Sequence, residues 1–216
     1  IRRLINGLSM SDSRICIRVA ALTGENSIYH TRHVISALGN DTYIQTRGIA
    51  QPISIDISGN IPNQLNMIFQ TSRKILAYQK ADILVWGYVP PSRNSIILRF
   101  IPLTMWDQQA PGSFNLETEI TLPIDFGEDY ANLLRATVIA AAIQSTSSRS
   151  LLSKRALQET LPKSHGALTE SSITLPNQQL SSMHSCYASA LCVSSLPNYE
   201  SNHLKLALEH FNISLS

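Results

Sequence analysis

The chain has 216 residues, 44% of them hydrophobic, and its 17 basic and 15 acidic side chains leave a formal net charge of +2. This length is enough for one full domain and part of a second. So small a charge argues against nucleic-acid binding through phosphate neutralisation and against a polybasic membrane patch, and no apolar run reaches membrane-spanning length.

The amino terminus and the cysteines both favour a cytoplasmic location. Asn6 and Gly7 interrupt the apolar run that a signal peptide would need. Cys16, Cys186 and Cys192 cannot all pair within one chain, and none lies in a CxxC spacing. We therefore expect buried free thiols in a reducing compartment, with no metal and no cofactor. The first residue is not methionine, which is compatible with a fragment of a longer protein.

The amino-terminal part of the chain is predicted to alternate strands with helices. Apolar residues recur at every second position over 14–22 and at helical spacing in two later segments. Asn26 or Ser27 is the expected N-cap of the first helix, and Pro52 restricts the segment that follows it to a sheet edge. In chain order we expect a strand over 14–22, a helix ending at Gly39, a short strand over 42–47, an extended segment over 53–57 and a helix from Pro62 to about Gln79.

The centre of the predicted core is the unbroken apolar run over 82–89, which is typical of a strand covered on both faces. Residues 95–101 follow after a short turn and predict its antiparallel partner. Gly87 indicates close packing beside Trp86. Residues 116–122 alternate as in a strand with one exposed face. The order of elements predicts an α/β (α+β) mixed-sheet domain over residues 1–145.

A further helix is predicted to end near Gln144. Asp125 and Glu128 form a capping-box pattern at its start, in which the Asp125 carboxylate accepts the Glu128 amide. The triplet that Asp125 begins also matches the metal-binding triplet of protein kinases, but the accompanying kinase loops are missing from the sequence. Capping is therefore the preferred interpretation.

Residues 150–216 are predicted to form a separate all-helical segment, because residues 145–150 have the composition of a linker. We expect a short helix over 151–161, a loop over 162–176, and helices over 177–194 and 199–215. Pro197 separates the last two helices, which predicts a helical hairpin.

The last two helices resemble one tetratricopeptide repeat. The matching residues are Tyr187, Ala188 and Ala190 in the first helix and Ala207, Phe211, Ser214 and Leu215 in the second. Ser214 replaces the usual alanine, and the Trp and Gly of the first helix are missing. The resemblance implies a longer repeat array that binds a protein partner, with Tyr187, His203 and His210 as candidate contacts.

Residues 14–101 resemble the α/β domain found before helical repeats in proteins similar to the amino-terminal domain of TolB. The resemblance lies in residues 81–89, where an Ala-Asp pair leads into a hydrophobic strand, a Trp-Gly pair and a valine, followed by a hairpin. It implies an accessory or sensing domain without catalytic residues.

One pair of histidines could carry chemistry. His30 and His33 lie about one helical turn apart and could share a metal ion. No carboxylate or cysteine cluster is visible nearby to complete a ligand shell, so a solvated helix face is the preferred interpretation.

A loop between the first strand and the first helix is the one candidate for ligand binding. Backbone amides of Thr23, Gly24 and Asn26 could hold an anion at the helix amino terminus, although Glu25 would repel it. The phosphate-binding glycine patterns are missing here.

The leading hypothesis is a non-enzymatic protein-interaction or scaffold module, in which an α/β accessory domain joins a helical-repeat segment. The alternative is a sensor whose α/β domain binds a small anionic ligand or nucleotide near Thr23, Gly24 and Asn26. An enzyme ranks third, since no set of nucleophile, base and orienting group can be assembled from the motifs.

Overall fold

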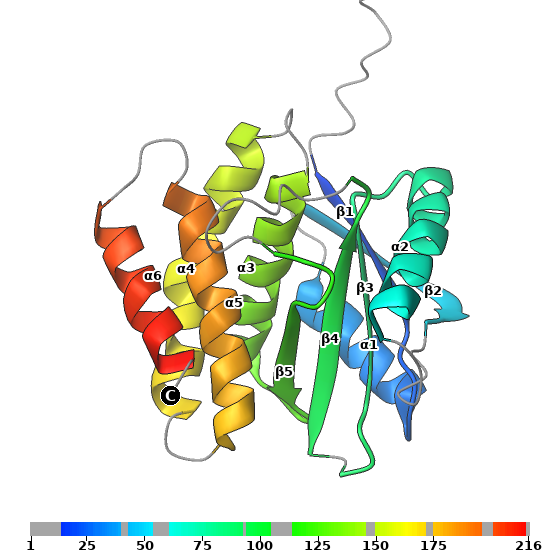
Figure 1. The fold of residues 1–216 in the computed structure, drawn as a ribbon, viewed down its shortest axis with the longest axis horizontal. Helices are drawn as coiled ribbons and strands as arrows, with labels where there is room; N and C mark the ends of the chain where they lie inside the picture. Colours follow the sequence, from blue (N-terminus) through cyan, green and yellow to red (C-terminus); the bar gives the residue numbers. More distant parts are fainter. Residues whose placement is uncertain are drawn as a thin grey trace, which may run out of the picture.

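A computed structural model describes residues 14–39, 43–53, 61–92, 94–104, 114–145, 150–171, 175–195 and 201–214. They form a mixed α/β fold, in which a five-stranded sheet is followed by a layer of helices (Figure 1). Within these ranges, no helix is both long and apolar enough to span a membrane. The elements are β1 (Ile15–Ala21), α1 (Ser27–Leu38), β2 (Ile44–Pro52), α2 (Ile61–Tyr78), β3 (Ile83–Tyr88), β4 (Ser95–Pro102), β5 (Glu119–Pro123), α3 (Glu128–Ser145), α4 (Ser150–Ser171), α5 (Asn177–Ser195) and α6 (Ser201–Ser214).

The sheet has the strand order β2-β1-β3-β4-β5. β1 pairs in parallel with β2 and β3, whereas β3 with β4 and β4 with β5 are antiparallel. This confirms the predicted mixed sheet. β2 ends at Pro52 and lies at the edge, where the missing N–H of proline costs no ladder bond. Most of the extended segment predicted over 53–57 lies outside the described residues.

β3 is buried on both faces, as predicted. Ile83 and Val85 point into the larger core cluster, and Leu84 and Trp86 point into the smaller one on the other face. A Cβ at Gly87 would overlap the carbonyl oxygen of Ile97 on β4, so only glycine allows the two backbones to pair there.

The helices divide between the two faces of the sheet. α1 and α3 cover the face that forms the larger core, whereas α2 covers the other face with Leu65, Phe69 and Leu76 (Figure 1). α2 therefore lies on the opposite side of the sheet from α1.

β5 differs from its prediction. It begins at Glu119 rather than at Leu116, and its central residues Ile120, Thr121 and Leu122 are all buried. The predicted exposed face is therefore wrong. The physical reason is α5, which packs along this end of the sheet (Figure 1).

Two side chains of α5 bond to the outer backbone edge of β5. The Thr121 N–H donates to the Ser182 hydroxyl oxygen at 2.9 Å, and the Cys186 thiol donates to the Glu119 carbonyl at 3.4 Å. Unpaired edge groups invite association with other strands, and covering them with a helix prevents this. α5 thus occupies the place of a sixth strand.

α4 is longer than predicted. Residues 162–171 are helical, so the predicted loop over 162–176 is wrong for these residues. Pro162 removes one backbone donor, which costs about 3 kcal/mol in a helix interior. Burial on both sides of the proline offsets this cost, and the buried residues are Ala156, Leu157, Leu161, Ala167 and Leu168.

α5 and α6 form the predicted helical hairpin. The Ser181 hydroxyl donates to the Ser214 carbonyl at 2.6 Å at one end, and Ser194 Oγ lies 3.3 Å from His203 Nδ1 at the other, so the helices are antiparallel. Both contribute to the core cluster that also contains the sheet, α1, α3 and α4. Residues on both sides of 145–150 therefore share one hydrophobic core.

All three cysteines are free thiols. Cys186 is fully buried, and burial raises the pKa of its thiol to about 12. The prediction of a buried free thiol is therefore confirmed at Cys186, whereas Cys16 and Cys192 are half-buried.

Replacing Ser182 by alanine tests whether α5 holds the edge of the sheet. The variant removes the oxygen that accepts the Thr121 N–H, and an unpaired buried amide costs about 1 to 3 kcal/mol. We expect Ser182→Ala to lower the free energy of unfolding and to speed hydrogen exchange at the Thr121 amide, followed by NMR. Ser181→Ala is the control, because Ser181 bonds to α6 instead. Unchanged Thr121 exchange in Ser182→Ala would contradict the role given to this bond.

Candidate functional site

The strand order creates a crevice at the carboxyl ends of β1 and β3. These strands are parallel neighbours, but β1 leads through α1 to β2 on one side while β3 lies on the other. The connecting helices α1 and α2 therefore lie on opposite faces. Open α/β sheets bind ligands at such reversals of strand order, because the loops diverge there and leave a hollow.

Backbone contacts hold the loop before α1 against the end of β3. The Thr23 N–H donates to the Gly87 carbonyl at 3.2 Å, and the Val89 N–H donates to the Thr23 carbonyl at 2.9 Å. Gly24 adopts a φ of 103°, and a Cβ there would overlap the Val89 carbonyl oxygen. Glycine is needed for this close approach.

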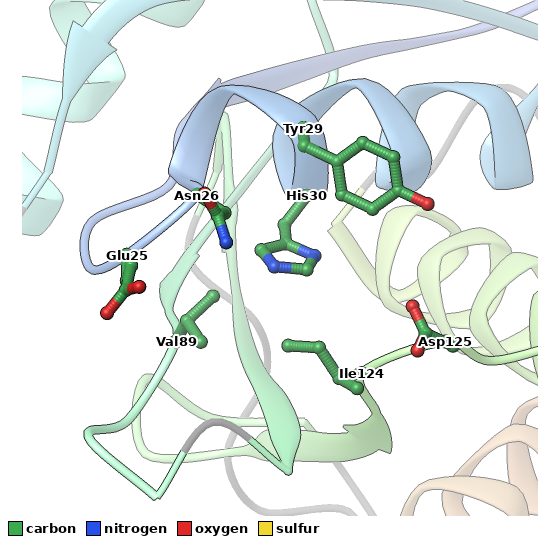
Figure 2. A pocket seen from close by; sticks show the side chains of 7 residues that line it. All are labelled: Glu25, Asn26, Tyr29, His30, Val89, Ile124 and Asp125. Atoms are coloured by element: carbon green, nitrogen blue, oxygen red, sulfur yellow. The ribbon is translucent and has the colours of Figure 1, made fainter.

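Seven residues line a hollow of about 490 Å³ at this point (Figure 2). Its volume lies in the range of small-molecule sites. The lining residues are Glu25, Asn26, Tyr29 and His30 at the start of α1, Val89 after β3, and Ile124 and Asp125 after β5.

His30 extends from α1 into this hollow (Figure 2). The residue is only 6% exposed, and its Nδ1 has no hydrogen-bond partner among the described residues. Leaving a buried polar atom unpaired costs about 1 to 3 kcal/mol. The predicted solvated face is therefore wrong for His30, because the turns after β3 and β5 close over this part of α1.

His33 does not join His30 in a metal site. Its Nε2 lies 3.1 Å from the Phe126 carbonyl oxygen, and its ring contacts the Phe126 ring at 4.3 Å between centroids. Throughout the described ranges, no group of three or more His, Cys, Asp or Glu side chains is arranged to hold a metal ion.

Asp125 faces the hollow from the side opposite Glu25 (Figure 2). The predicted capping role is wrong because α3 begins at Glu128, and the Gly127 carbonyl accepts the first helical bond, from Ala131, at 3.0 Å. Asp125 therefore lies two residues too early to cap the helix. Its carboxylate makes no hydrogen bond or ion pair within the described part of the chain.

The predicted ligand residues occupy two different positions. Asn26 lines the hollow, whereas Thr23 and Gly24 form the backbone wall beside Val89. Sequence reasoning missed His30 and Asp125 as lining residues. No local sequence pattern could have assigned both residues to one site, because they line the same hollow only after β5 has paired in the folded sheet.

Two of the three predicted partner contacts line a second hollow, between α4, α5 and α6. Tyr187 and His203 line this groove of about 410 Å³, together with Gln158, Leu161, Pro162, His165, Leu191 and Leu206. His210 is only 5% exposed and does not lie on an exposed repeat surface as predicted. Its ring instead packs against the rings of Tyr187 and His184.

His184 and His210 form a buried pair between α5 and α6. Their Nδ1 atoms lie 2.6 Å apart, so one nitrogen donates a proton and the other accepts it. Burial lowers the pKa of His184, and nearby His165 lowers it further. Burial, together with His184 and His165, lowers the pKa of His210 to about 4. The pair is therefore uncharged at neutral pH.

Comparisons of the chain with models of protein families, with curated proteins and with solved structures find no match. The mixed α/β fold and the two hollows described above are therefore the basis for inferring function.

The buried histidine pair predicts lower stability in weak acid. An unfolded histidine titrates with a pKa near 6.5, whereas the pKa of folded His210 is about 4. Between these values the unfolded chain binds more protons, so the free energy of unfolding falls as the pH decreases from about 7 toward 4. We expect the urea midpoint to fall across this range in the wild type and to fall less in His210→Phe.

His203→Phe is the control for this measurement, because His203 lies on the same helix outside the buried pair. It should keep the wild-type dependence on pH. Equal pH dependence in the wild type and His210→Phe would contradict the role given to the pair.

Proposed function

We propose that this chain is a small-molecule-binding module whose ligand lies in the hollow at the carboxyl ends of β1 and β3. The observation that carries the proposal is His30 Nδ1, which is buried beside the hollow without a partner among the described residues. Native folds pair nearly all of their buried polar atoms. A bound ligand would supply the missing partner.

The surroundings of His30 support a preformed site. Val89 and Ile124 give the hollow apolar walls, and Asp125 adds a polar group on the far side. Small-molecule sites combine apolar walls with a few polar groups in this way. Because the backbone bonds of Thr23 fix the wall near Val89, the hollow does not depend on a ligand to form.

A sensing role is consistent with the position of Asp125. The turn that contains it leads from β5 into α3, and α3 packs against both α4 and α5. A ligand held at this turn would therefore contact the segment that joins the sheet to the helical layer. We propose a sensor domain as the form that the binding function takes.

A fragment screen read out on the histidine side chains by NMR tests this proposal. We expect some members of a library containing acids, bases and neutral compounds to shift the His30 ring signals. Ile124→Trp should abolish these shifts, because the larger ring fills the hollow. Ile213→Trp is the control, since Ile213 is 48% exposed on α6. A library that leaves the His30 signals unchanged would overturn the proposal.

The groove between α4, α5 and α6 supports a second function, which is protein binding through a tetratricopeptide-like hairpin. Ala207 is buried and Phe211 packs against the core, in keeping with the small and aromatic positions of that repeat. Tyr187 and His203, which the sequence suggests as partner contacts, line the groove. Its mostly apolar lining suits an apolar side chain of a bound peptide.

A random peptide library displayed on phage tests the groove. Peptides selected on the wild type should bind Leu206→Lys at least about tenfold more weakly, because burying one large apolar side chain contributes about 1.5 to 3 kcal/mol. Leu208→Lys is the matched control, since Leu208 is 64% exposed on the same helix and does not line the groove. Selected peptides that bind both variants equally well would exclude the groove as their site.

A further inference from the structure

We infer that the side chain bound in the groove between α4, α5 and α6 is a tryptophan or a tyrosine of the partner, whose N–H or O–H group pairs with the Tyr187 hydroxyl. This inference rests on the proposed protein-binding function of the groove and names the chemistry of the partner at its point of contact.

Tyr187 brings an unpaired hydroxyl to the groove. The residue lines the groove and is only 3% exposed, yet its hydroxyl makes no hydrogen bond within the described part of the chain. Among the described residues, the polar atoms that are fully enclosed without a partner all belong to other side chains. The Tyr187 hydroxyl therefore keeps a contact with solvent, and that contact lies in the groove that the residue lines.

Neighbouring rings hold Tyr187 in position. Its ring lies edge-on to His210 at 4.8 Å and tilted against His165 at 6.1 Å between centroids. Burial raises the pKa of Tyr187, so its hydroxyl keeps the proton and can both donate and accept a hydrogen bond. A bound side chain that covered this hydroxyl without pairing with it would weaken its own binding about fivefold or more. The bound side chain therefore needs a polar group.

α4 supplies an acceptor that favours a donor on the partner. Pro162 has no N–H, so the carbonyl of Gln158, four residues earlier, lacks its helical donor. Gln158 and Pro162 both line the groove. A side chain with an N–H or O–H group can donate to this carbonyl or to the Tyr187 oxygen, whereas leucine and phenylalanine can pair with neither.

The lining of the groove disfavours a charged side chain. Its eight residues include no aspartate, glutamate, lysine or arginine. Lys163, Lys205 and Glu209 are exposed on α4 and α6 without lining the groove, and Arg155 pairs with Glu159 at 3.1 Å. A charge buried in the groove would therefore lack a carboxylate, lysine or arginine as its partner. Tryptophan, tyrosine and arginine dominate binding at protein interfaces, and this lining favours the first two.

The shape of the groove also suits a ring with one polar atom. Leu161, Leu191 and Leu206 provide apolar walls around a volume of about 410 Å³. Tryptophan and tyrosine combine a large apolar body with one polar tip, so they fill sites that are apolar at one end and polar at the other. The leucines would contact the body of the ring while the tip reaches Tyr187.

Two matched pairs of capped amino acids test the inference. The N-acetyl amides of tyrosine and phenylalanine differ only in the hydroxyl, and those of tryptophan and benzothienylalanine differ only in the N–H, which sulfur replaces. Binding to the full chain is followed by NMR through the Leu206 methyl and Tyr187 ring signals. The buffer is at about pH 8, above the range in which histidine ordinarily titrates. We expect the donor compound to bind at least about threefold more tightly in one or both pairs, which is the effect of one hydrogen bond.

Tyr187→Phe should reduce this advantage to less than about twofold, because it removes only the hydroxyl. The variant should fold normally, since the hydroxyl has no partner within the described residues. Tyr78→Phe is the matched control, because Tyr78 is 85% exposed at the end of α2, and it should keep the wild-type advantage. An advantage that survives in Tyr187→Phe would overturn the inference.

The peptides selected on phage separate this inference from the protein-binding function. Peptides that require Leu206 but bind through a leucine, phenylalanine or arginine would overturn the aromatic donor and support the groove as a peptide site. Equal binding within both pairs of amides would likewise overturn only the inference. If no selected peptide requires Leu206 and no amide shifts the Leu206 or Tyr187 signals, both proposals are overturned.

Discussion

The outer edge of β5 carries backbone groups that need partners, and α5 supplies them through Ser182 and Cys186. These side chains are four residues apart and so lie on one face of the helix, while Glu119 and Thr121 are two apart and so point to one side of the strand. Because the four-residue spacing on the helix matches the two-residue spacing on the strand, both bonds form at once and hold α5 against the sheet. α3, α4 and α6 then pack into the core that α5 and the sheet share. The helical tail therefore packs directly on the sheet.

The position of β5 also determines the candidate site. Because β5 is held at the sheet edge, the turn that follows it lines the same hollow as the start of α1. This turn is also tied to the residue before β4, since the Ile124 N–H donates to the Asn94 carbonyl at 3.2 Å. Ile124 and Asp125 thereby close the hollow that β1, β3 and α1 leave open. The site therefore depends on β1 and β3 inside the sheet and on β5 at its edge. Its two polar residues, His30 and Asp125, come from segments far apart in the chain.

Local sequence patterns predicted the elements whose own residues carry a clear apolar period or a required glycine. The unbroken run of β3, the glycine at position 87 and the approximate places of the strands and helices before them follow from periodicity and backbone geometry. β2 is longer than predicted, because it continues to Pro52 instead of ending at Arg47. Predictions failed where distant packing overrides a local signal. Taken alone, Pro162 predicts that the helix ends before it, but burial of Leu161 and Leu168 keeps α4 continuous. The burial of His30 and the place of Asp125 likewise depend on contacts that no single stretch of sequence contains.

The reactivity of the Cys186 thiol can report on the contact between α5 and the sheet. Only the thiolate reacts readily with alkylating agents, and the burial that raises the pKa of this thiol to about 12 keeps it protonated. The same thiol bonds to the strand edge. A reagent can therefore modify this sulfur only after the helix has separated from the sheet, and the labelling rate reports how often that separation occurs.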